Sequence, residues 1–367
     1  MDGEESLVRK YSVGWGVTSL CNMNCRFCYS KYKREGRDDL SLNDWIKFFE
    51  ENREVIGNIN FGTGENSLCD DWFHLIKVIR KSDERHRMAV TTNGYLYEAV
   101  KKEWRLKAFC EAIDEIDVSL DFADAAFHNQ FRGQNNAYEW ALNTLKLCEE
   151  YNKSATIVFI GCKDTLNKNN IDGLFEIADK YNAKLRMNIY RPTEGINNIT
   201  SDYIAEYENF LEILYYISEK YKILAINDEF FSSILTDTRI KSNLRNAQET
   251  SIRILPNGNI TPSTYLLDDE FVVGNICDTN VLLDDKVIRK LEYFLKKTLP
   301  VECDGCKYED TCEGGVLDRR YLWYGSQFRK DPYCLDMPNE DIRKLDISVE
   351  DFESVHDGYL PTMFFKP

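Results

Sequence analysis

The stretch Thr18-Ser19-Leu20-Cys21-Asn22-Met23-Asn24-Cys25-Arg26-Phe27-Cys28-Tyr29 places three cysteines at Cys-x3-Cys-x2-Cys spacing. It follows residues 11–17, a short apolar segment that is typical of a strand. Cysteine thiolates at such spacings hold iron–sulfur clusters. A cubane cluster needs four ligands, so three cysteines from one loop leave one iron open to a chelating molecule. Cys21, Cys25 and Cys28 are therefore the predicted ligands of a [4Fe–4S] cluster.

Two other interpretations of the three cysteines are weaker. They could form half of a zinc site, but tetrahedral zinc needs a fourth ligand, usually from a second pair of cysteines or histidines. No Cys or His follows Cys28 until Cys69 and His74. Buried thiols clustered by chance rarely show this spacing beside a strand. The cluster loop remains the preferred interpretation.

The composition limits the classes of protein that the chain can belong to. Its 367 residues are enough for two domains, and its net charge of −16 argues against a nucleic-acid partner. No apolar run approaches the length of a membrane span, and the acidic residues 1–5 do not begin a signal peptide. We therefore expect a cytoplasmic protein without a disulfide framework, in which metal or cluster ligation is the better use for a chain with twelve cysteines. One basic run, Lys31, Lys33, Arg34 and Arg37, could meet an acidic electron donor.

Strand-like and helix-like segments alternate from about residue 12 to residue 222. Six short apolar segments alternating with amphipathic ones predict an α/β domain with a parallel sheet. The alternation stops in 223–250, which we expect to be a linker. The predicted strands are 11–17, 58–61, 88–92, 115–120, 155–160 and 184–190, and the predicted helices are 40–52, 72–79, 97–113, 137–151, 171–181 and 203–221.

The cysteine loop and the alternating pattern together resemble radical S-adenosylmethionine (SAM) enzymes. In that family the amino and carboxylate groups of SAM bind the open iron, and Phe27 and Tyr29 match the aromatic residues that flank the last cysteine. The resemblance implies a partial (β/α)6 TIM-like barrel over residues 11–222, with the chemistry at the carboxyl ends of the strands. It also implies reductive cleavage of SAM to a 5′-deoxyadenosyl radical that abstracts hydrogen from a substrate, and a flavodoxin- or ferredoxin-type electron donor.

The resemblance assigns candidate SAM-binding residues at the predicted strand ends. Gly62-Thr63-Gly64-Glu65 matches a Gly-Gly-Glu run that binds the SAM amino group, with Thr63 as the single departure. Each candidate could instead be an ordinary turn or surface residue. Arg132 and, second, Arg186 suit the SAM carboxylate because a guanidinium makes bidentate contacts. The other candidates are Asn93, Ser119 and Asp121.

A second set of cysteines, Cys303-x2-Cys306-x5-Cys312 and then Cys334, resembles the SPASM module of radical SAM enzymes. Two positions at which that module carries ligands of an inner cluster are Ser263 and Val316, so we expect one auxiliary [4Fe–4S] cluster, held by these four cysteines. Zinc in the same site is the alternative. The module is predicted over 251–340, after a hairpin with an Asn-Gly turn at 254–262, and 341–367 is left as a tail.

The predicted substrate is a ribosomally made peptide that is crosslinked, oxidised or epimerised. An epimerase needs a thiol hydrogen donor, and Cys162 and Cys69 are the candidates for this catalytic role, although buried inert thiols are commoner. A peptide substrate would require a groove in this chain or a separate leader-peptide-binding protein. The alternatives are dehydrogenation or epimerisation of a sugar or aminocyclitol, and a non-catalytic iron–sulfur or zinc protein.

Overall fold

The computed structural model describes residues 11–34, 38–194, 202–236, 250–296, 298–334, 342–345, 347, 352, 354–356 and 360–367. Arg37 of the predicted basic run and residues 237–249 of the predicted linker lie outside the described residues. Among the helices that are described, none has the length and apolarity that crossing a membrane requires.

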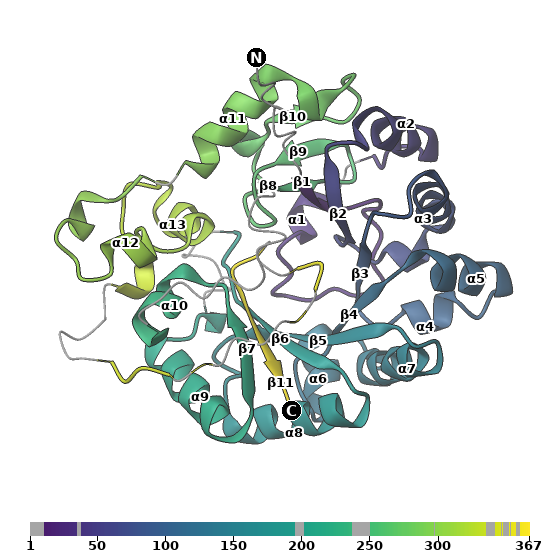
Figure 1. Ribbon diagram of the computed structural model, residues 1–367. Helices are drawn as coiled ribbons and strands as arrows, with labels where there is room; N and C mark the ends of the chain where they lie inside the picture. Colours follow the sequence, from purple (N-terminus) through teal and green to yellow (C-terminus); the bar gives the residue numbers. More distant parts are fainter. Residues whose placement is uncertain are drawn as a thin grey trace, which may run out of the picture.

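Six parallel strands follow one another across the centre of the sheet in chain order, and helices surround them on the outside (Figure 1). This arrangement confirms the predicted α/β partial barrel. The strands are β1 (Tyr11–Trp15), β2 (Ile56–Phe61), β3 (Met88–Thr92), β4 (Glu115–Ser119), β5 (Ser154–Gly161) and β6 (Lys184–Ile189). The helices of this part are α1 (Lys31–Arg34), α2 (Leu42–Asn52), α3 (Asp70–Ser82), α4 (Leu96–Ala99), α5 (Glu103–Ala112), α6 (Ala125–Arg132), α7 (Ala137–Glu150), α8 (Lys168–Lys180) and α9 (Tyr207–Lys220).

Local sequence explains most of these elements. Every residue of β1 and β4 is buried, as expected for parallel strands covered on both faces. Helix α2 starts with a capping box in which Ser41 and Asp44 bind each other's backbone amides. The predicted helix 97–113 is two helices, α4 and α5. The backbone at Lys102, directly before α5, is extended and interrupts the helical pattern. Arg105 fills the break by donating to the carbonyl of Ala99.

The sheet does not end at β6, and the C-terminal segment is part of it. Strand β11 (Thr362–Lys366) lies antiparallel between β6 and β7 (Lys222–Ile226). The expectation of a separate tail over 341–367 is therefore wrong for this strand. Two sheet edges that would otherwise be unpaired gain backbone hydrogen bonds from β11, and this is the physical reason for its place.

The other end of the sheet leads into the cysteine-rich part. Strand β8 (Thr250–Ile254) pairs parallel with β1 and antiparallel with β9 (Asn259–Thr261), which in turn pairs with β10 (Gly274–Asn275). Gly258 has a φ of +83°, as the predicted Asn-Gly turn requires. The remaining helices are α10 (Glu229–Thr236), α11 (Asp285–Leu295), α12 (Glu309–Cys312) and α13 (Leu317–Tyr324).

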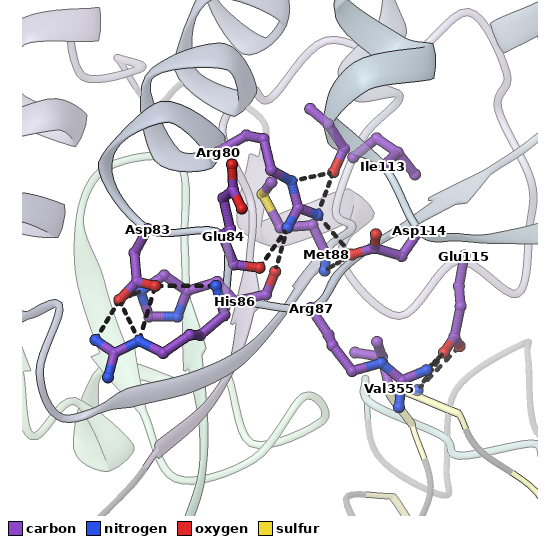
Figure 2. A network of polar contacts seen from close by, with 12 residues as sticks. Arg80, Asp83, Glu84, His86, Arg87, Met88, Ile113, Asp114, Glu115 and Val355 are labelled. Atoms are coloured by element: carbon purple, nitrogen blue, oxygen red, sulfur yellow. Dashed lines mark hydrogen bonds and ion pairs between the residues drawn. The ribbon is translucent and has the colours of Figure 1, made fainter.

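A polar network closes the barrel at the amino ends of β3 and β4 (Figure 2). The Asp114 carboxylate accepts from the Arg80 guanidinium at 2.6 Å and from the backbone amide of Met88 at 2.8 Å. Glu115, which also pairs with Arg87, accepts from the backbone amide of Val355 at 2.9 Å. The network fixes the segment before β11 beneath the barrel, opposite the strand ends at which we predict the chemistry.

Candidate active site

One cavity opens inside the barrel and contains most of the predicted cofactor-binding residues. Its walls come from the loop after β1 and from the carboxyl halves of the central strands. All three cysteines of the loop line it, which fits a cluster whose irons must face a bound molecule. The predicted residues in the lining are Cys21, Cys25, Phe27, Cys28, Tyr29, Gly62, Thr63, Gly64, Asn93, Ser119 and Arg132.

Polar side chains hold the cysteine loop in place. The Asp39 carboxylate accepts from the Thr18 hydroxyl at 2.7 Å and from the backbone amide of Ser19 at 2.9 Å. The Arg34 guanidinium donates to the carbonyl of Ser19 at 2.6 Å. These bonds satisfy backbone groups of a loop that contains no regular structure, so the loop keeps one shape.

The thiols of the loop lie among donors that suit thiolates. The Asn93 amide nitrogen is 3.7 Å from the Cys21 sulfur, and an Arg34 nitrogen is 3.8 Å from the Cys28 sulfur. Burial raises the pKa of Cys21, and it raises the pKa of Cys25 to about 12. The free thiols of Cys21 and Cys25 therefore keep their protons at neutral pH, and iron binding would displace these protons. Three cysteines that line one cavity, with amide and guanidinium donors beside their sulfurs, fit a [4Fe–4S] cluster.

The turn after β2 packs directly on the cysteine loop. Gly64 has a φ of +64°, and a Cβ atom there would lie 2.4 Å from the carbonyl oxygen of Leu20 and 2.6 Å from that of Thr18. The next residue, Glu65, donates its backbone amide to the Leu20 carbonyl at 2.8 Å. Only glycine fits this position, so the turn and the loop are built as one unit.

Replacing Gly64 by Ala is expected to lower SAM cleavage by about 100-fold, because the loop must move by roughly an ångström to admit the Cβ atom. The measurement is 5′-deoxyadenosine formation together with iron content. Gly325→Ala is the matched control: Gly325 has a φ of +63° but nothing within 4 Å of the added atom. Equal losses in the two variants would show that backbone strain, and not the contact with the loop, is responsible.

The carboxylate of Glu65 does not line the cavity, contrary to its predicted role with the SAM amino group. The side chain is fully buried and accepts from the Ser67 hydroxyl at 2.5 Å, the Thr92 hydroxyl at 3.0 Å and the backbone amide of Asn93 at 2.7 Å. Burial raises its pKa, whereas these hydrogen bonds lower it. Glu65 ties the end of β3 to the turn after β2, and so orients Asn93 toward Cys21.

Asp121 is a second candidate that lies behind the cavity wall. It is fully buried, accepts from Arg132 Nε at 2.6 Å and accepts from the backbone amide of Ile160 at 3.0 Å. Arg132 itself lines the cavity, with its guanidinium 5.0 Å from the ring centre of Phe27. Burial lowers the pKa of Arg132, but Asp121 outweighs burial and raises it. Asp121 therefore positions Arg132 rather than facing the cavity.

The structure does not bring the two candidate hydrogen donors to the cavity wall. Cys162 is fully buried, 3.5 Å from the Thr165 hydroxyl, and burial raises its pKa to about 11. Cys69 directly precedes α3, and burial also raises its pKa. Neither thiol is among the lining residues, so their hydrogen-donor role gains no support from the geometry.

The cavity also contains residues that the sequence did not single out for it. Arg191, Arg253, Thr264 and Tyr265 line the wall toward the cysteine-rich part, and His356 lies near the floor. Arg186, the second candidate for the SAM carboxylate, pairs with Asp117 at 3.0 Å. The alternation of side chains along a strand could have predicted the face of β8 on which Arg253 lies. It could not have predicted that this face lines the cavity.

The four late cysteines line a separate pocket between α10 and α12. Burial raises the pKa of Cys303 to about 11 and also raises the pKa of Cys312 and Cys334. Among the described residues no three Cys, His, Asp or Glu side chains converge on the position of a single ion. The cysteines of a [4Fe–4S] cluster bind different irons and surround a volume, so the pocket suits a cluster.

A buried ion-pair network supports this pocket from behind. Arg319 on α13 is fully buried between Asp228, at 2.8 Å, and Asp331, at 2.6 Å. The carbonyl of Asp331 accepts from the amide of Cys334 at 2.9 Å. The positions that would hold an inner cluster carry Ser263, which donates to Asp318 at 3.2 Å, and the buried Val316.

Comparisons with known proteins agree with this geometry. Mycofactocin maturase MftC of Mycobacterium ulcerans is 22% identical over 348 residues, which cover 90% of this chain and 89% of the relative. AdoMet-dependent heme synthase of Nitratidesulfovibrio vulgaris is 23% identical over 361 residues, which cover 89% of this chain and 92% of the relative. The crystal structure of Streptococcus suis SuiB bound to precursor peptide SuiA superposes with a TM-score of 0.68 at 16% identity, over 89% of this chain and 76% of SuiB.

The family itself is identified over the barrel. Residues 15–189 match the Radical SAM superfamily, and this range contains the cysteine loop, the turn at Gly64, the last residue of β1 and the whole of the strands β2 to β6. A [4Fe–4S] cluster and SAM are therefore cofactors of this protein. Residues 15–189 form a radical SAM domain, and the protein is a radical SAM enzyme.

Proposed function

We propose that this enzyme modifies a ribosomally made peptide and that Cys303, Cys306, Cys312 and Cys334 hold one auxiliary [4Fe–4S] cluster. The observation that carries the proposal is the placement of the three loop cysteines and the Gly64 turn in one cavity whose far wall comes from the cysteine-rich part. When bound, the cluster and SAM supply the radical that abstracts hydrogen from the substrate. Two relatives named for maturation support a peptide: MftC, which matches 90% of this chain, and the sporulation killing factor maturation protein SkfB of Bacillus subtilis, which matches 51% of it.

The residues of the chain have distinct roles in this proposal. Asn93 and Arg34 stabilise the thiolates of the cysteine loop, and the backbone at Gly64 faces the SAM amino group. Arg132, held by Asp121, would bind the SAM carboxylate, and Ser119 at the end of β4 lines the same cavity. Phe27, which stacks on Phe131 with ring centres 4.2 Å apart, excludes water from one side of the loop.

The proposed partners follow from the surroundings of the cysteine loop. Helix α1 directly follows this loop and presents Lys31 and Lys33, which suit an acidic flavodoxin or ferredoxin in the cytoplasm. Lys33 also forms an ion pair with Asp268, with Nζ and Oδ1 2.5 Å apart. A separate protein that binds the leader of the peptide completes the proposed assembly.

The test of the substrate uses the anaerobically reconstituted enzyme with SAM and dithionite. The probes are peptides encoded beside its gene and, as the second candidate, a tetrapyrrole, because a heme synthase matches as well as a maturase does. A mass change in a peptide together with 5′-deoxyadenosine supports the proposal. Turnover of a tetrapyrrole or of a sugar, with no peptide changed, contradicts it.

The auxiliary cluster has its own test. Replacing the four late cysteines by Ala is expected to lower the iron content from about eight to about four per chain, while 5′-deoxyadenosine formation without substrate remains. The control is Cys277→Ala, because Cys277 is exposed and lies outside both cysteine sites. Zinc in the wild-type protein beside about four irons would show that the four cysteines form a zinc site.

A further inference from the structure

Arg253 on β8 is a buried cation in the cavity wall. Arg253 is 2% exposed. Its two terminal guanidinium nitrogens lie 3.5 and 3.6 Å from the point that a Cβ atom would occupy if Gly62 had a side chain. It donates to the hydroxyls of Thr63 and, at 3.1 Å, Tyr29. Its Nε has no partner among the described residues, and none of their carboxylates pairs with it. A buried charge without a counter-charge is unfavourable, so this site is incomplete as it stands.

Four other arginines line the same cavity, and three of them differ from Arg253 because each has its own carboxylate, whereas Arg34 donates to the Ser19 carbonyl and lies beside the Cys28 sulfur. Arg132 pairs with Asp121 at 2.6 Å, Arg186 with Asp117 at 3.0 Å, and Arg191 with Asp318 at 2.8 Å. These three carboxylates lie behind the wall, and no Asp or Glu is found among the described residues that line the cavity. The cavity of this acidic protein is therefore cationic, and Arg253 contributes charge that its neighbours do not balance.

Two further donors face the same wall without partners. Arg191 Nη2 and the Thr264 hydroxyl are buried and have no hydrogen-bond partner among the described residues. Arg191 lies 5.0 Å from the ring centre of Tyr265, whose ring is 5.6 Å from that of Tyr29, the residue that Arg253 contacts. Three unfilled donors and two aromatic rings thus share the wall toward the cysteine-rich part.

We propose that Arg253, with Arg191 Nη2 and the Thr264 hydroxyl, binds a carboxylate of the substrate. A guanidinium matches a carboxylate in a bidentate contact, and the single charge of Arg253 matches a monoanion. This inference rests on the proposed function, in which the carboxylate belongs to the C-terminus or to an acidic side chain of the peptide. Arg253 then selects the substrate and fixes its position beside the cysteine loop.

The conformation of Thr63 supports this assignment. Thr63 has a φ of +80°, which is unfavourable for a β-branched residue, at the place where the family pattern has glycine. Its hydroxyl accepts from Arg253 Nη2. The chain therefore keeps a strained residue whose side chain orients the guanidinium, and such strain is found where the geometry of a site matters.

The test measures binding of small carboxylates to the reconstituted enzyme with SAM by equilibrium dialysis. The probes are N-benzoylglycine, which mimics a peptide C-terminus, N-acetylaspartate α-amide, which has only the side-chain carboxylate, and the uncharged amide of each. We expect at least one acid to bind about tenfold more tightly than its amide, and Arg253→Gln to reduce this preference to about twofold or less. The better acid identifies the source of the carboxylate.

The controls separate this site from SAM binding and from misfolding. Arg253→Lys keeps the charge and should retain part of the preference, and Arg85→Gln changes an exposed arginine and should retain all of it. The SAM dissociation constant should change by less than about threefold in Arg253→Gln, with iron content and circular dichroism unchanged. Absence of any preference in the wild type, a preference that survives Arg253→Gln, or an equal loss of SAM affinity would each overturn the proposal. Failure of the wild type to modify any peptide would instead contradict the proposed function and leave the binding result intact.

Discussion

Replacing Cys21, Cys25 and Cys28 together by Ala is expected to abolish 5′-deoxyadenosine formation and to lower the iron content from about eight to about four per chain. The three sulfurs line the cavity together, and the loop contains no other thiol that could replace them. We expect the rate to fall by more than about 1,000-fold, since chemistry carried by a cofactor has no substitute in the protein. Iron analysis and chromatography of the anaerobic reaction measure both effects.

The same experiment needs a variant in which a thiol is lost without any effect on the cavity. Cys277→Ala serves again, because its thiol is exposed and contacts neither cysteine site. The variant of the cysteine loop should keep its auxiliary iron, since Cys303 and its partners lie in a different pocket. Residual SAM cleavage in the triple variant would place the catalytic cluster elsewhere in the chain.

Replacing Arg319 by Ala is expected to have the largest effect on stability. Its guanidinium lies between the carboxylates of Asp228 and Asp331, and all three side chains are at most 1% exposed. Removing it leaves two buried carboxylates without a counter-charge, which costs about 3–5 kcal/mol of the free energy of unfolding. Because Asp331 also fixes Cys334, we expect loss of the auxiliary iron at a lower denaturant concentration than in the wild type.

An exposed ion pair on the same molecule gives the comparison. Arg343 and Glu219 are 3.0 Å apart, with side chains that are 59% and 64% exposed. Arg343→Ala should lower the free energy of unfolding by less than about 1 kcal/mol, because water screens the pair. Denaturant titration of both variants measures the difference. Similar small losses would show that the two aspartates take up protons or water when Arg319 is removed.

The features that the sequence predicts well are those with local causes. The capping box at Ser41, the Asn-Gly turn before β9 and the cysteine loop each depend on residues a few positions apart. The six parallel strands follow from short apolar segments between amphipathic helices, and every one of them is found. Local hydrogen bonding and periodicity therefore determine the order of the elements and the place of the cluster.

The features that the sequence misses depend on contacts between distant segments. The sequence pattern predicts that Glu65 binds SAM, but its carboxylate accepts hydrogen bonds from Thr92 at the end of β3 and from the following Asn93. The sequence of β11 is short and apolar, and nothing in it predicts which strands it pairs with. Its partners β6 and β7 are distant in the chain. Arg253 becomes part of the cavity only through the pairing of β8 with β1. Such placements follow from the assembled sheet and not from spacing.

The position of β11 has a consequence for the way in which the protein is made. A ribosome translates β6 and β7 long before residues 362–366. Until β11 is made, the growing chain therefore has two strand edges whose backbone hydrogen bonds are unpaired. Such edges can pair with other chains until β11 arrives. We therefore expect nascent forms of this enzyme to depend on chaperones, and a premature stop codon shortly before Thr362 to yield aggregated protein even though every cysteine is already present.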